Sequence, residues 1–561
     1  MRLWKLVVFT LALGGSALAQ PARQRAMIAA ANPLAVESGL AVLRAGGSAA
    51  DAAVAVQATL ALVEPQSSSV SGGAFMTFYD ARTHTVTAYD GRETAPAAAT
   101  SGYFLKADGQ SMSTVEIILS GRSAGVPGAI AMLSMAQKEH GRLPWRALFA
   151  GSERLATEGF VVSPRLGGFI ASGMVPEGKA PDVVAYFTNP DGSRMKTGDR
   201  LRNPAYAATL RKIAAEGPAA ILTGSIAADI VRRLGEQPNP GLMTLADLAA
   251  YKPLKSAALC APYRKWTVCE PNAPSGGPAI LEGLGLLQRT DIATRGPMDP
   301  VGWLRLAEAE RLMYADDLKY VADPAFVTVP VRGLIDAGYL DARAKLIGDR
   351  AGPPPAAGDP PGAPRPGADK TREPGGTTSF VIVDGRGNVV SMTTTVNYPF
   401  GDGRMVDGFF INNQLNDFSS VAVDASGAAV ANAVGPGKRP RSSMGPAIVL
   451  DANHRFVMAV GSPGGLAIPS YILKTIVGAL DWKLPMQDAI DLPNLISVGP
   501  NFVGETVKFS PGLLKGLADL GVTVKEGFGA EDSGIHGIIV RGDHLEGGAD
   551  PRREGVVKSC C

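Results

Sequence analysis

The pattern of apolar residues near the start of the chain predicts helices packed in a core. Residues 33–64 read as two helices separated at Gly46-Gly47. Ser48, with Asp51 three residues later, resembles a capping box that begins the second helix. That helix, Ala49 to Val63, is rich in alanine and apolar on nearly every side. We therefore expect it to be buried on all sides.

Strand-like alternation follows these two helices. Residues 74–80 and 85–89 predict a hairpin that ends at Asp90-Gly91-Arg92-Glu93. From about residue 113 to residue 345 helical periodicity dominates, interrupted by strands near residues 254–270. Most of the predicted helices therefore precede residue 350.

Residues 351–376 form the clearest boundary in the chain. They hold eight prolines and six glycines in 26 positions. A segment of this composition builds no core, so we expect an extended, exposed and flexible linker. One interpretation is a hinge between domains. The residues that follow suggest a second interpretation, a segment that precedes a site of chain cleavage.

The segment directly after this linker predicts a β-hairpin. Two strand-like runs, 377–383 and 389–396, flank a five-residue turn centred on Arg386. This centre places Thr377 opposite Thr395, unless a bulge shifts the register. Period-two alternation then separates a hydroxyl face from an apolar core face. The hydroxyl face carries Thr377, Ser379, Ser391, Thr393 and Thr395, and the apolar face carries Phe380, Ile382, Val390, Met392 and Val396.

Composition narrows the class of protein. The chain has 561 residues, of which 46% are hydrophobic and 19% are charged. Its charged fraction is below the average of roughly 25%, which excludes wholesale disorder. The net charge of +2 gives no reason to expect nucleic acid or an anionic membrane as the main partner. The length allows three or four domains or one large α/β unit.

Residues 1–19 predict a signal peptide. Arg2 and Lys5 precede a short apolar run at residues 6–13, and Ala17-Leu18-Ala19 matches a signal-peptidase site. We therefore expect an exported protein, periplasmic or secreted, without a membrane span in its mature form. The alternative is an uncleaved anchor, which the shortness of the apolar run disfavours.

The four cysteines fall into two pairs. Cys260 and Cys269 flank Ala261-Pro262-Tyr263, which we interpret as a hairpin tip, and export would permit a disulfide between them. Two unpaired thiols remain the alternative, because the sequence does not supply the geometry. Cys560-Cys561 forms a terminal tail that matches no metal-ligand spacing.

The hydroxyl of Thr377 is a candidate nucleophile that lacks an ordinary base. The five histidines lie in no nucleophile-like setting, and the G-x-S-x-G, H-E-x-x-H and Walker A patterns do not occur. Cleavage between Gly376 and Thr377 would free an α-amino group with a pKa of about 7.7–8.0. This group would lie within reach of the Thr377 hydroxyl and could serve as its base. Gly376 would leave room for attack on its own carbonyl. The alternative is an ordinary threonine at a strand edge.

Three downstream clusters supply further polar groups. Residues 412–417 gather amides and a carboxylate that suit an ammonium, and residues 438–444 place hydroxyls beside positive charge, which suits a carboxylate. A strand at 456–460 leads through residues 461–465 into a helix at 466–480, where glycine N–H groups at a helix start suit an oxyanion. Each cluster alone also fits a structural role: a capped polar turn, a solvated basic loop, or a plain strand-to-helix turn.

Together and in this order, the motifs resemble the γ-glutamyltranspeptidase (γ-glutamyltransferase) family of the N-terminal-nucleophile hydrolase superfamily. The similarity covers almost the whole chain after the signal peptide. The matching segments are Ala49–Met76, Asp90–Pro96, Gly125–Gly128, Thr377–Asp384, Asn412–Asp417, Asn432–Pro446, Gly461–Gly465 and Ala549–Arg552. The resemblance implies an α+β fold, the four-layer αββα sandwich, shared by two non-covalently associated subunits of one self-cleaved precursor. These subunits would be residues 20–376 and 377–561.

The resemblance also implies the roles of individual residues. Thr377 matches the nucleophile, exposed by self-cleavage at Gly376–Thr377, and Thr395 matches the threonine that orients and activates it. Gly464 and Gly465 match the oxyanion hole. The residues that match the donor-binding groups are Arg92, Ser442 and Ser443 for the α-carboxylate, and Asn397, Gln414 and Asp417 for the α-ammonium.

The implied activity is that of an exported γ-glutamyltransferase and hydrolase. A γ-glutamyl amide, such as glutathione, would form an ester on Thr377 that is released to water, an amino acid or a dipeptide. The resemblance implies no metal and no organic cofactor, and no nucleic acid as a partner.

Two departures from the family pattern leave the substrate open. Ser379 stands where the family often has histidine, and the segment 419–431 is shorter than the lid of many members and lacks its aromatic residue. We therefore expect a more open site, with less selectivity for glutathione and less efficient transpeptidation. The alternatives are a cephalosporin or glutaryl acylase of the same superfamily, or an unprocessed, non-catalytic binding protein. Asp417 favours an aminated donor, whereas the short lid favours the acylase.

Overall fold

The computed structural model describes most of the chain, in six ranges: residues 26–106, 108–172, 176–371, 373, 375–527 and 533–561. The predicted signal peptide, residues 1–19, lies outside these ranges. Within them no single helix has the length and apolar character to cross a membrane. One helix pair, bent by 112°, meets the criterion on length and composition alone: Pro204–Glu216 with Ala219–Leu234.

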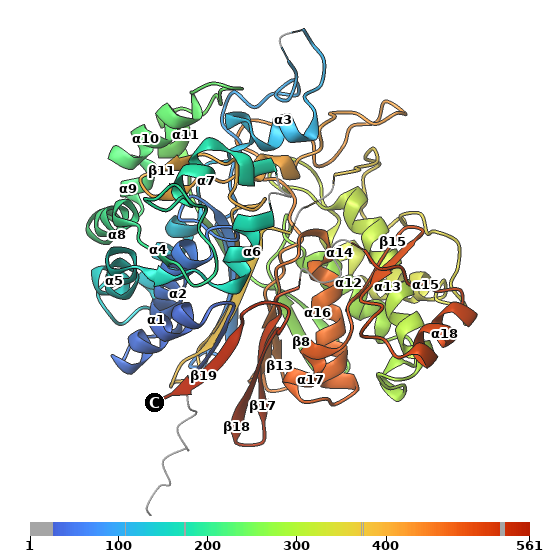
Figure 1. Ribbon diagram of the computed structural model, residues 1–561. Helices are drawn as coiled ribbons and strands as arrows, with labels where there is room; N and C mark the ends of the chain where they lie inside the picture. The colour runs from blue at the N-terminus through green and yellow to red at the C-terminus, as the bar shows by residue number, and fades with distance from the viewer. Residues whose placement is uncertain (1–25, 107, 173–175, 372, 374, 528–532) are drawn as a thin grey trace, which may run out of the picture.

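Two antiparallel sheets lie face to face at the centre of the molecule (Figure 1). The first sheet, in the order β19-β1-β9-β10-β2-β3-β6, consists of β1 (Ala26–Ala30), β2 (Gly73–Asp80), β3 (Thr85–Asp90), β6 (Leu254–Ala257), β9 (Thr377–Val383), β10 (Val389–Thr395) and β19 (Val556–Cys560). The second sheet, in the order β18-β17-β14-β13-β8-β7, consists of β7 (Leu259–Tyr263), β8 (Trp266–Glu270), β13 (Ala447–Leu450), β14 (Phe456–Gly461), β17 (His536–Arg541) and β18 (His544–Ala549). Three short ladders pair β4 (Phe160–Val161) with β5 (Arg200–Leu201), β11 (Met405–Val406) with β12 (Phe409–Phe410), and β15 (Leu495–Val498) with β16 (Asn501–Gly504).

Helices cover the outer side of each sheet (Figure 1). The first sheet is covered by α1 (Pro33–Arg44), α2 (Ala49–Val63) and α4 (Ala129–His140), with α5 (Ala150–Glu158) and α8 (Pro204–Glu216) beyond them. The second sheet is covered by α12 (Gly277–Leu287), α13 (Pro300–Tyr320), α16 (Ile468–Ile476) and α17 (Met486–Asp491). The peripheral helices are α3 (Thr114–Ile118), α6 (Pro164–Ser172), α7 (Pro181–Tyr186), α9 (Ala219–Leu222), α10 (Ser225–Leu234), α11 (Leu245–Ala250), α14 (Val331–Leu334), α15 (Ala337–Ala344) and α18 (Pro511–Asp519).

The alanine-rich helix α2 is buried along its whole length, as its apolar composition predicts. Its capping box is also confirmed: the Ser48 side chain accepts from the backbone N–H of Asp51, and Asp51 accepts from the N–H of Ser48. The same carboxylate accepts from the N–H of Arg142 at 2.8 Å. The buried Asp51 carboxylate therefore accepts hydrogen bonds from the main chain of two separate segments.

The predicted β9–β10 hairpin has the predicted register, with Thr377 opposite Thr395 and no bulge. Its apolar face, including Phe380 and Ile382, packs into the core under the helices of the first sheet. Its other face meets the second sheet, where the Ser391 hydroxyl donates to the carbonyl of Val460 at 3.2 Å. The hydroxyl face is therefore buried between the two sheets.

The described residues of 351–376 are extended, with no helix and only a one-residue bridge, and they are only partly exposed. The Tyr320 hydroxyl donates to the carbonyl of Gly358 at 2.6 Å, and Ala351 N–H donates to the carbonyl of Leu520 at 2.8 Å. Asp369 is buried against the Arg441 guanidinium at 3.0 Å. Proline and glycine prevent regular structure here, yet the segment contacts the ends of α13 and α18 and the loop that carries Arg441. The segment is therefore extended, as predicted, but only part of it is exposed, because residues such as Asp369 are buried.

Cys260 and Cys269 are joined by a disulfide that crosses the β7–β8 hairpin. The disulfide is thus confirmed, and the alternative of two unpaired thiols is wrong. The predicted hairpin tip is wrong, however, because residues 261–263 belong to β7 and the turn follows at Arg264, which has φ 56°. Cys560 and Cys561 are bonded to each other at the end of β19.

Candidate active site

Thr377 and Thr395 form the centre of the site, and their hydroxyls are joined in a short relay. The Thr377 hydroxyl donates to Thr395 Oγ1 at 3.1 Å, and the Thr395 hydroxyl donates to the carbonyl oxygen of Gly376 at 3.0 Å. The N–H of Asn397 donates to the same Thr395 oxygen at 2.8 Å. The relay therefore ends on the carbonyl of the bond that is expected to break, and it polarises that carbonyl.

Gly376 is required by a close approach between two stretches of main chain. A Cβ at this position would lie 1.7 Å from the carbonyl oxygen of Asn397. Asn397 itself has φ 77°, a conformation that asparagine tolerates better than most residues. The structure thus shows a reason for glycine that differs from the expected one, which was room for the attacking hydroxyl.

The loop after β14 carries the two candidate oxyanion glycines. Gly464 has φ 133° and Gly465 has φ 55°, both strained for other residues, and a Cβ on Gly464 would lie 2.4 Å from the ring of Tyr471. A short 3₁₀ turn at Gly465–Ala467 leads into α16, which confirms the predicted strand–turn–helix order. Within the described ranges, no residue accepts a hydrogen bond from the N–H of Gly464 or Gly465. Both donors are therefore available.

Arg92 and Asp417 contact each other, although we expected them to bind opposite groups of a substrate. Arg92 Nη2 lies 2.6 Å from Asp417 Oδ2, and both side chains are buried. Arg92 also donates to the carbonyls of Pro440 and Arg441. Burial raises the pKa of Asp417, and the neighbouring Arg92 opposes that rise by stabilising the carboxylate.

The other predicted donor-binding residues surround this ion pair. Gln414 Nε2 donates to Asp417 Oδ2 at 2.6 Å, and Asn397 Nδ2 donates to the carbonyl of Asn413 at 3.0 Å. The Ser442 hydroxyl accepts from the N–H of Met444. The main chain and side chains thus fix the loops around Asp417 before any substrate arrives.

Four buried polar atoms of the predicted donor-binding residues have no hydrogen-bond partner within the described part of the chain. Two of them can donate, Arg92 Nη1 and Ser443 Oγ, and two accept, Asp417 Oδ1 and Gln414 Oε1. Arg92 Nη1 has only the buried Glu93 carboxylate at 3.8 Å, beyond hydrogen-bond distance. A buried polar atom without a partner costs about 1–3 kcal/mol. Donors suit a carboxylate and acceptors suit an ammonium, so the cluster is complementary to an α-amino acid group.

Sequence reasoning missed Glu373, and it noted Arg441 only as part of the basic loop at residues 438–444. The Glu373 carboxylate accepts from the Ser443 N–H at 2.6 Å and from Arg441 Nε at 3.2 Å, and its carbonyl accepts from the Leu466 N–H at 3.3 Å. Arg441 is fully buried, so the basic loop is not a solvated one. No motif marks Glu373, because its partners lie about 70 residues away or more.

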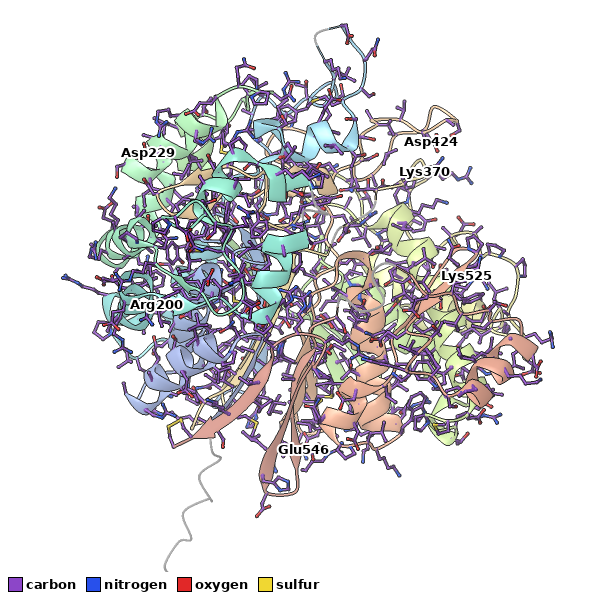
Figure 2. The ribbon with its side chains drawn as sticks, viewed as in Figure 1. Arg200, Asp229, Lys370, Asp424, Lys525 and Glu546 are labelled. Atoms are coloured by element: carbon purple, nitrogen blue, oxygen red, sulfur yellow. A yellow bond between two sulfur atoms is a disulfide. The ribbon has the colours of Figure 1, made fainter. Side chains whose placement is uncertain are left out.

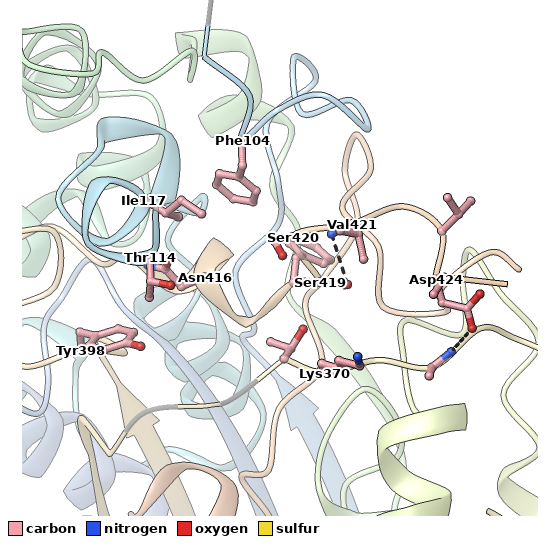
Figure 3. A pocket seen from close by; sticks show the side chains of 15 residues that line it. Phe104, Thr114, Ile117, Lys370, Tyr398, Asn416, Ser419, Ser420, Val421 and Asp424 are labelled. Carbon is pink, nitrogen blue, oxygen red and sulfur yellow. Dashed lines mark hydrogen bonds between the residues drawn. The ribbon is translucent and has the colours of Figure 1, made fainter. Parts of the chain in front are cut away.

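A cavity of about 560 Å³ opens beside the donor-binding cluster (Figure 3). Tyr398, Asn416, Phe104 and Ile117 are among the residues that line it, and Ile117 lies beside Asn416 (Figure 3). The short segment 419–431, the lid, forms its outer rim. Figure 2 shows Asp424 of the lid and Lys370 of the linker on the same edge of the molecule. The effect of this lid on selectivity stays a prediction.

Among the residues that the structure covers, no group of three or more His, Cys, Asp and Glu side chains is placed to hold a metal. The polar groups of the site are instead the hydroxyls, amides and paired charges described above.

Comparisons with known proteins place this site in a family. Residues 35–560 match the sequence model of the gamma-glutamyltranspeptidase family. The glutathione hydrolase proenzyme of Escherichia coli is 34% identical over 94% of this chain and 90% of its own length. The acylase ACY 1 proenzyme of a Pseudomonas species is 33% identical over 85% of this chain and 83% of its own. A cephalosporin acylase structure from Bacillus halodurans superposes with a TM-score of 0.81 at 25% identity, covering 98% of this chain and 99% of that one.

The matched range contains every residue of the hydroxyl relay, the glycine loop and the donor-binding cluster. The chain therefore belongs to the γ-glutamyltranspeptidase family, and it is an enzyme.

Proposed function

We propose that this enzyme cleaves itself before Thr377 and then hydrolyses or transfers γ-glutamyl groups from glutathione-like amides. The observation that carries the proposal is the set of four unpartnered buried atoms, two donors and two acceptors. Identity alone does not separate a γ-glutamyl enzyme from an acylase, because relatives of both kinds are about equally similar. The unpartnered acceptors favour a donor that carries an ammonium.

Self-cleavage follows from the relay. The Thr377 hydroxyl oxygen attacks the Gly376 carbonyl carbon, which Thr395 already polarises at 3.0 Å. The bond between this carbon and the amide nitrogen breaks, and that nitrogen takes up the hydroxyl proton. Water then hydrolyses the ester, leaving a carboxylate on Gly376 and a free α-amino group on Thr377.

Turnover uses the new α-amino group as the base. It takes the proton of the Thr377 hydroxyl as the oxygen attacks the γ-carbonyl of the donor, and the N–H groups of Gly464 and Gly465 stabilise the oxyanion. The leaving amine takes the proton, and a γ-glutamyl ester remains on Thr377. Water or an acceptor amine then attacks this ester and restores the hydroxyl.

Recognition of the donor uses the ion-paired cluster. Arg92 Nη1 and Ser443 Oγ donate to the α-carboxylate, while Asp417 Oδ1 and Gln414 Oε1 accept from the α-ammonium. Asn397 and Ser442 lie beside these atoms as further ligands. Because Arg92 and Asp417 already neutralise each other, a zwitterionic group adds no net charge to the buried cluster.

The wider arrangement fits the same function. We propose that the two sheets and their covering helices are the four-layer αββα sandwich of the N-terminal-nucleophile hydrolases. Residues 20–376 and 377–561 would then be two non-covalently joined subunits, since β9 pairs with β1 in one sheet. Export, removal of residues 1–19 and a choice of amino acid or dipeptide acceptors belong to the same proposal.

A glutaryl or cephalosporin acylase is the second candidate, and the TM-score of 0.81 to a cephalosporin acylase favours it. The experiment that separates the two compares γ-glutamyl-p-nitroanilide with glutaryl-p-nitroanilide on the purified two-chain protein. We expect faster release of p-nitroaniline from the γ-glutamyl compound. A preference for the glutaryl compound would replace the γ-glutamyl proposal with the acylase.

A further inference from the structure

A buried arginine that none of the roles above includes contacts the main chain of the nucleophile. Arg553 Nη1 donates to the carbonyl oxygen of Thr377 at 2.6 Å, and the Arg553 side chain is 7% exposed. A charge-assisted hydrogen bond inside the protein is about twice as strong as a neutral one. The nucleophilic residue is therefore held from its own carbonyl as well as through its hydroxyl.

Arg553 reaches this carbonyl because the turn at residues 550–553 presents two consecutive arginines in different directions. Arg552 binds Asp550 and Glu505, with Nη1 3.1 Å from Asp550 Oδ1. Asp550 in turn accepts from the Ser533 hydroxyl and the Ile535 N–H, which ties the turn to the strand β17. Arg552 thus anchors the turn, and Arg553 extends toward β9.

The path of the Arg553 side chain is made by a glycine. A Cβ on Gly534 would lie 2.6 Å from Arg553 Cδ and 2.8 Å from Nε. The same Cβ would lie 2.8 Å from Pro463, in the loop that carries the oxyanion glycines. Arg553 therefore passes close to both the nucleophile strand and the oxyanion loop.

The sheet itself does not support Thr377 on the side of β9 that faces β1. The strand β1 pairs with β9 from Met27 opposite Val383 only as far as Ala30 opposite Phe380. The last three residues of β9 toward the site, 377–379, have β10 alone as a described strand neighbour. Arg553 supplies a donor where that ladder has ended.

We propose that Arg553 is a positioning residue for Thr377. By binding the carbonyl of Thr377 it fixes the orientation of that residue's hydroxyl during both self-cleavage and turnover. The inference rests on the proposed role of Thr377 as nucleophile. Arg553 contacts the carbonyl of Thr377 and not its hydroxyl, so its effect would be exerted through the main chain of Thr377.

The test compares Arg553→Met, Arg553→Lys and the exposed control Arg455→Met with the wild type. Three quantities are measured: the rate at which the two chains appear, kcat and KM for γ-glutamyl-p-nitroanilide per mole of N-terminal Thr377, and Tm. We expect Arg553→Met to slow maturation and kcat by roughly tenfold to a hundredfold, as for loss of a hydrogen bond to a charged group, with KM within about twofold. Arg553→Lys should recover much of both rates, and the control should match the wild type.

Two results would overturn the inference. One is an Arg553→Met protein that matures and turns over at wild-type rates. The other is a loss that follows a lowered Tm and is not recovered by lysine, which would make Arg553 a structural residue only. If the wild type matures but releases nothing from the γ-glutamyl compound, the proposed substrate is wrong, whereas the maturation rates still decide the role of Arg553.

Discussion

The proposed nucleophile and the proposed donor-binding cluster are built in different ways. Thr377 and Thr395 are placed by the backbone register of two adjacent strands. Arg92 and Asp417 are placed by loops that are 325 residues apart in the chain, and they hold each other through an ion pair. The position of the proposed reactive group therefore depends on sheet geometry, whereas the proposed recognition of substrate depends on charges that compensate each other. Each region should therefore fail in its own way.

The largest effect should come from removing the nucleophile itself. Thr377→Ala leaves the sheet register intact but removes the attacking oxygen, so the chain should remain a single precursor without activity. SDS gels and N-terminal sequencing check this result. Thr377→Ser keeps an oxygen and serves as the matched control, which should still be cut. A mature wild-type protein cut at any other bond would contradict the assignment of Thr377.

The next largest effect should fall on recognition and leave maturation unchanged. Asp417→Asn removes the charge that faces the ammonium and unbalances Arg92, at a cost of about 2–5 kcal/mol for a γ-glutamyl donor. A glutaryl amide has no ammonium, so it should lose much less. Rates with both p-nitroanilides measure the difference, with the exposed Asp519→Asn as control. Equal losses for both substrates would show that Asp417 does not read the ammonium.

Thr395→Ala should affect both processes, because the relay serves cleavage and turnover alike. Loss of a hydroxyl that supports the reacting atoms costs on the order of 2–4 kcal/mol. Maturation kinetics and kcat should fall together, and Thr395→Ser should recover most of each. A Thr395→Ala variant slowed in only one of the two steps, self-cleavage or turnover, would contradict a relay shared by both.

The sequence pattern was sufficient for the features that depend on neighbours in the chain. The count across the turn at Arg386 placed Thr377 opposite Thr395, and the composition of α2 predicted its burial. The hairpin tip near Pro262 was misplaced because proline suggests a turn. Here it lies in β7, an edge strand, where a residue without an N–H is tolerated.

The contacts that sequence reasoning missed all join distant segments. Glu373 meets Ser443, and Arg553 meets Thr377, across 70 and 176 residues. No periodicity or local motif encodes such pairs, since the tertiary fold alone brings them together. The family resemblance named residues of the donor site, but it did not show that Arg92 and Asp417 would be paired with each other.

The smallest predicted effect concerns the support behind the nucleophile. His536 Nδ1 lies 3.2 Å from the Ser379 hydroxyl, and burial lowers the pKa of His536 to about 3 from an ordinary 6.5. The unfolded chain therefore binds a proton below pH 6.5 that the folded protein does not, so stability falls as the pH falls. Between pH 7 and pH 5 this amounts to at most about 2 kcal/mol.

His536→Gln should remove that part of the acid sensitivity. Urea midpoints at pH 7 and pH 5 measure it, and the exposed His544→Gln serves as the control, which should behave like the wild type. An unchanged difference between the two pH values in His536→Gln would place the acid-sensitive group elsewhere.

The position of Glu373 implies that, after the proposed cleavage, its carboxylate would compete with the carboxylate of the donor. Its carboxylate already accepts from Ser443, beside the atoms proposed to bind the donor carboxylate, and it lies three residues before the new chain end at Gly376. Cleavage of the Gly376–Thr377 bond would not release Glu373 from this position, because Asp369 of the same segment remains bound to Arg441. A group tethered by a short segment acts at an effective concentration in the millimolar range. On the proposed cleavage, breaking the bond and vacating the site would be separate events, and the second would set the concentration of donor at which the newly cleaved enzyme begins to work.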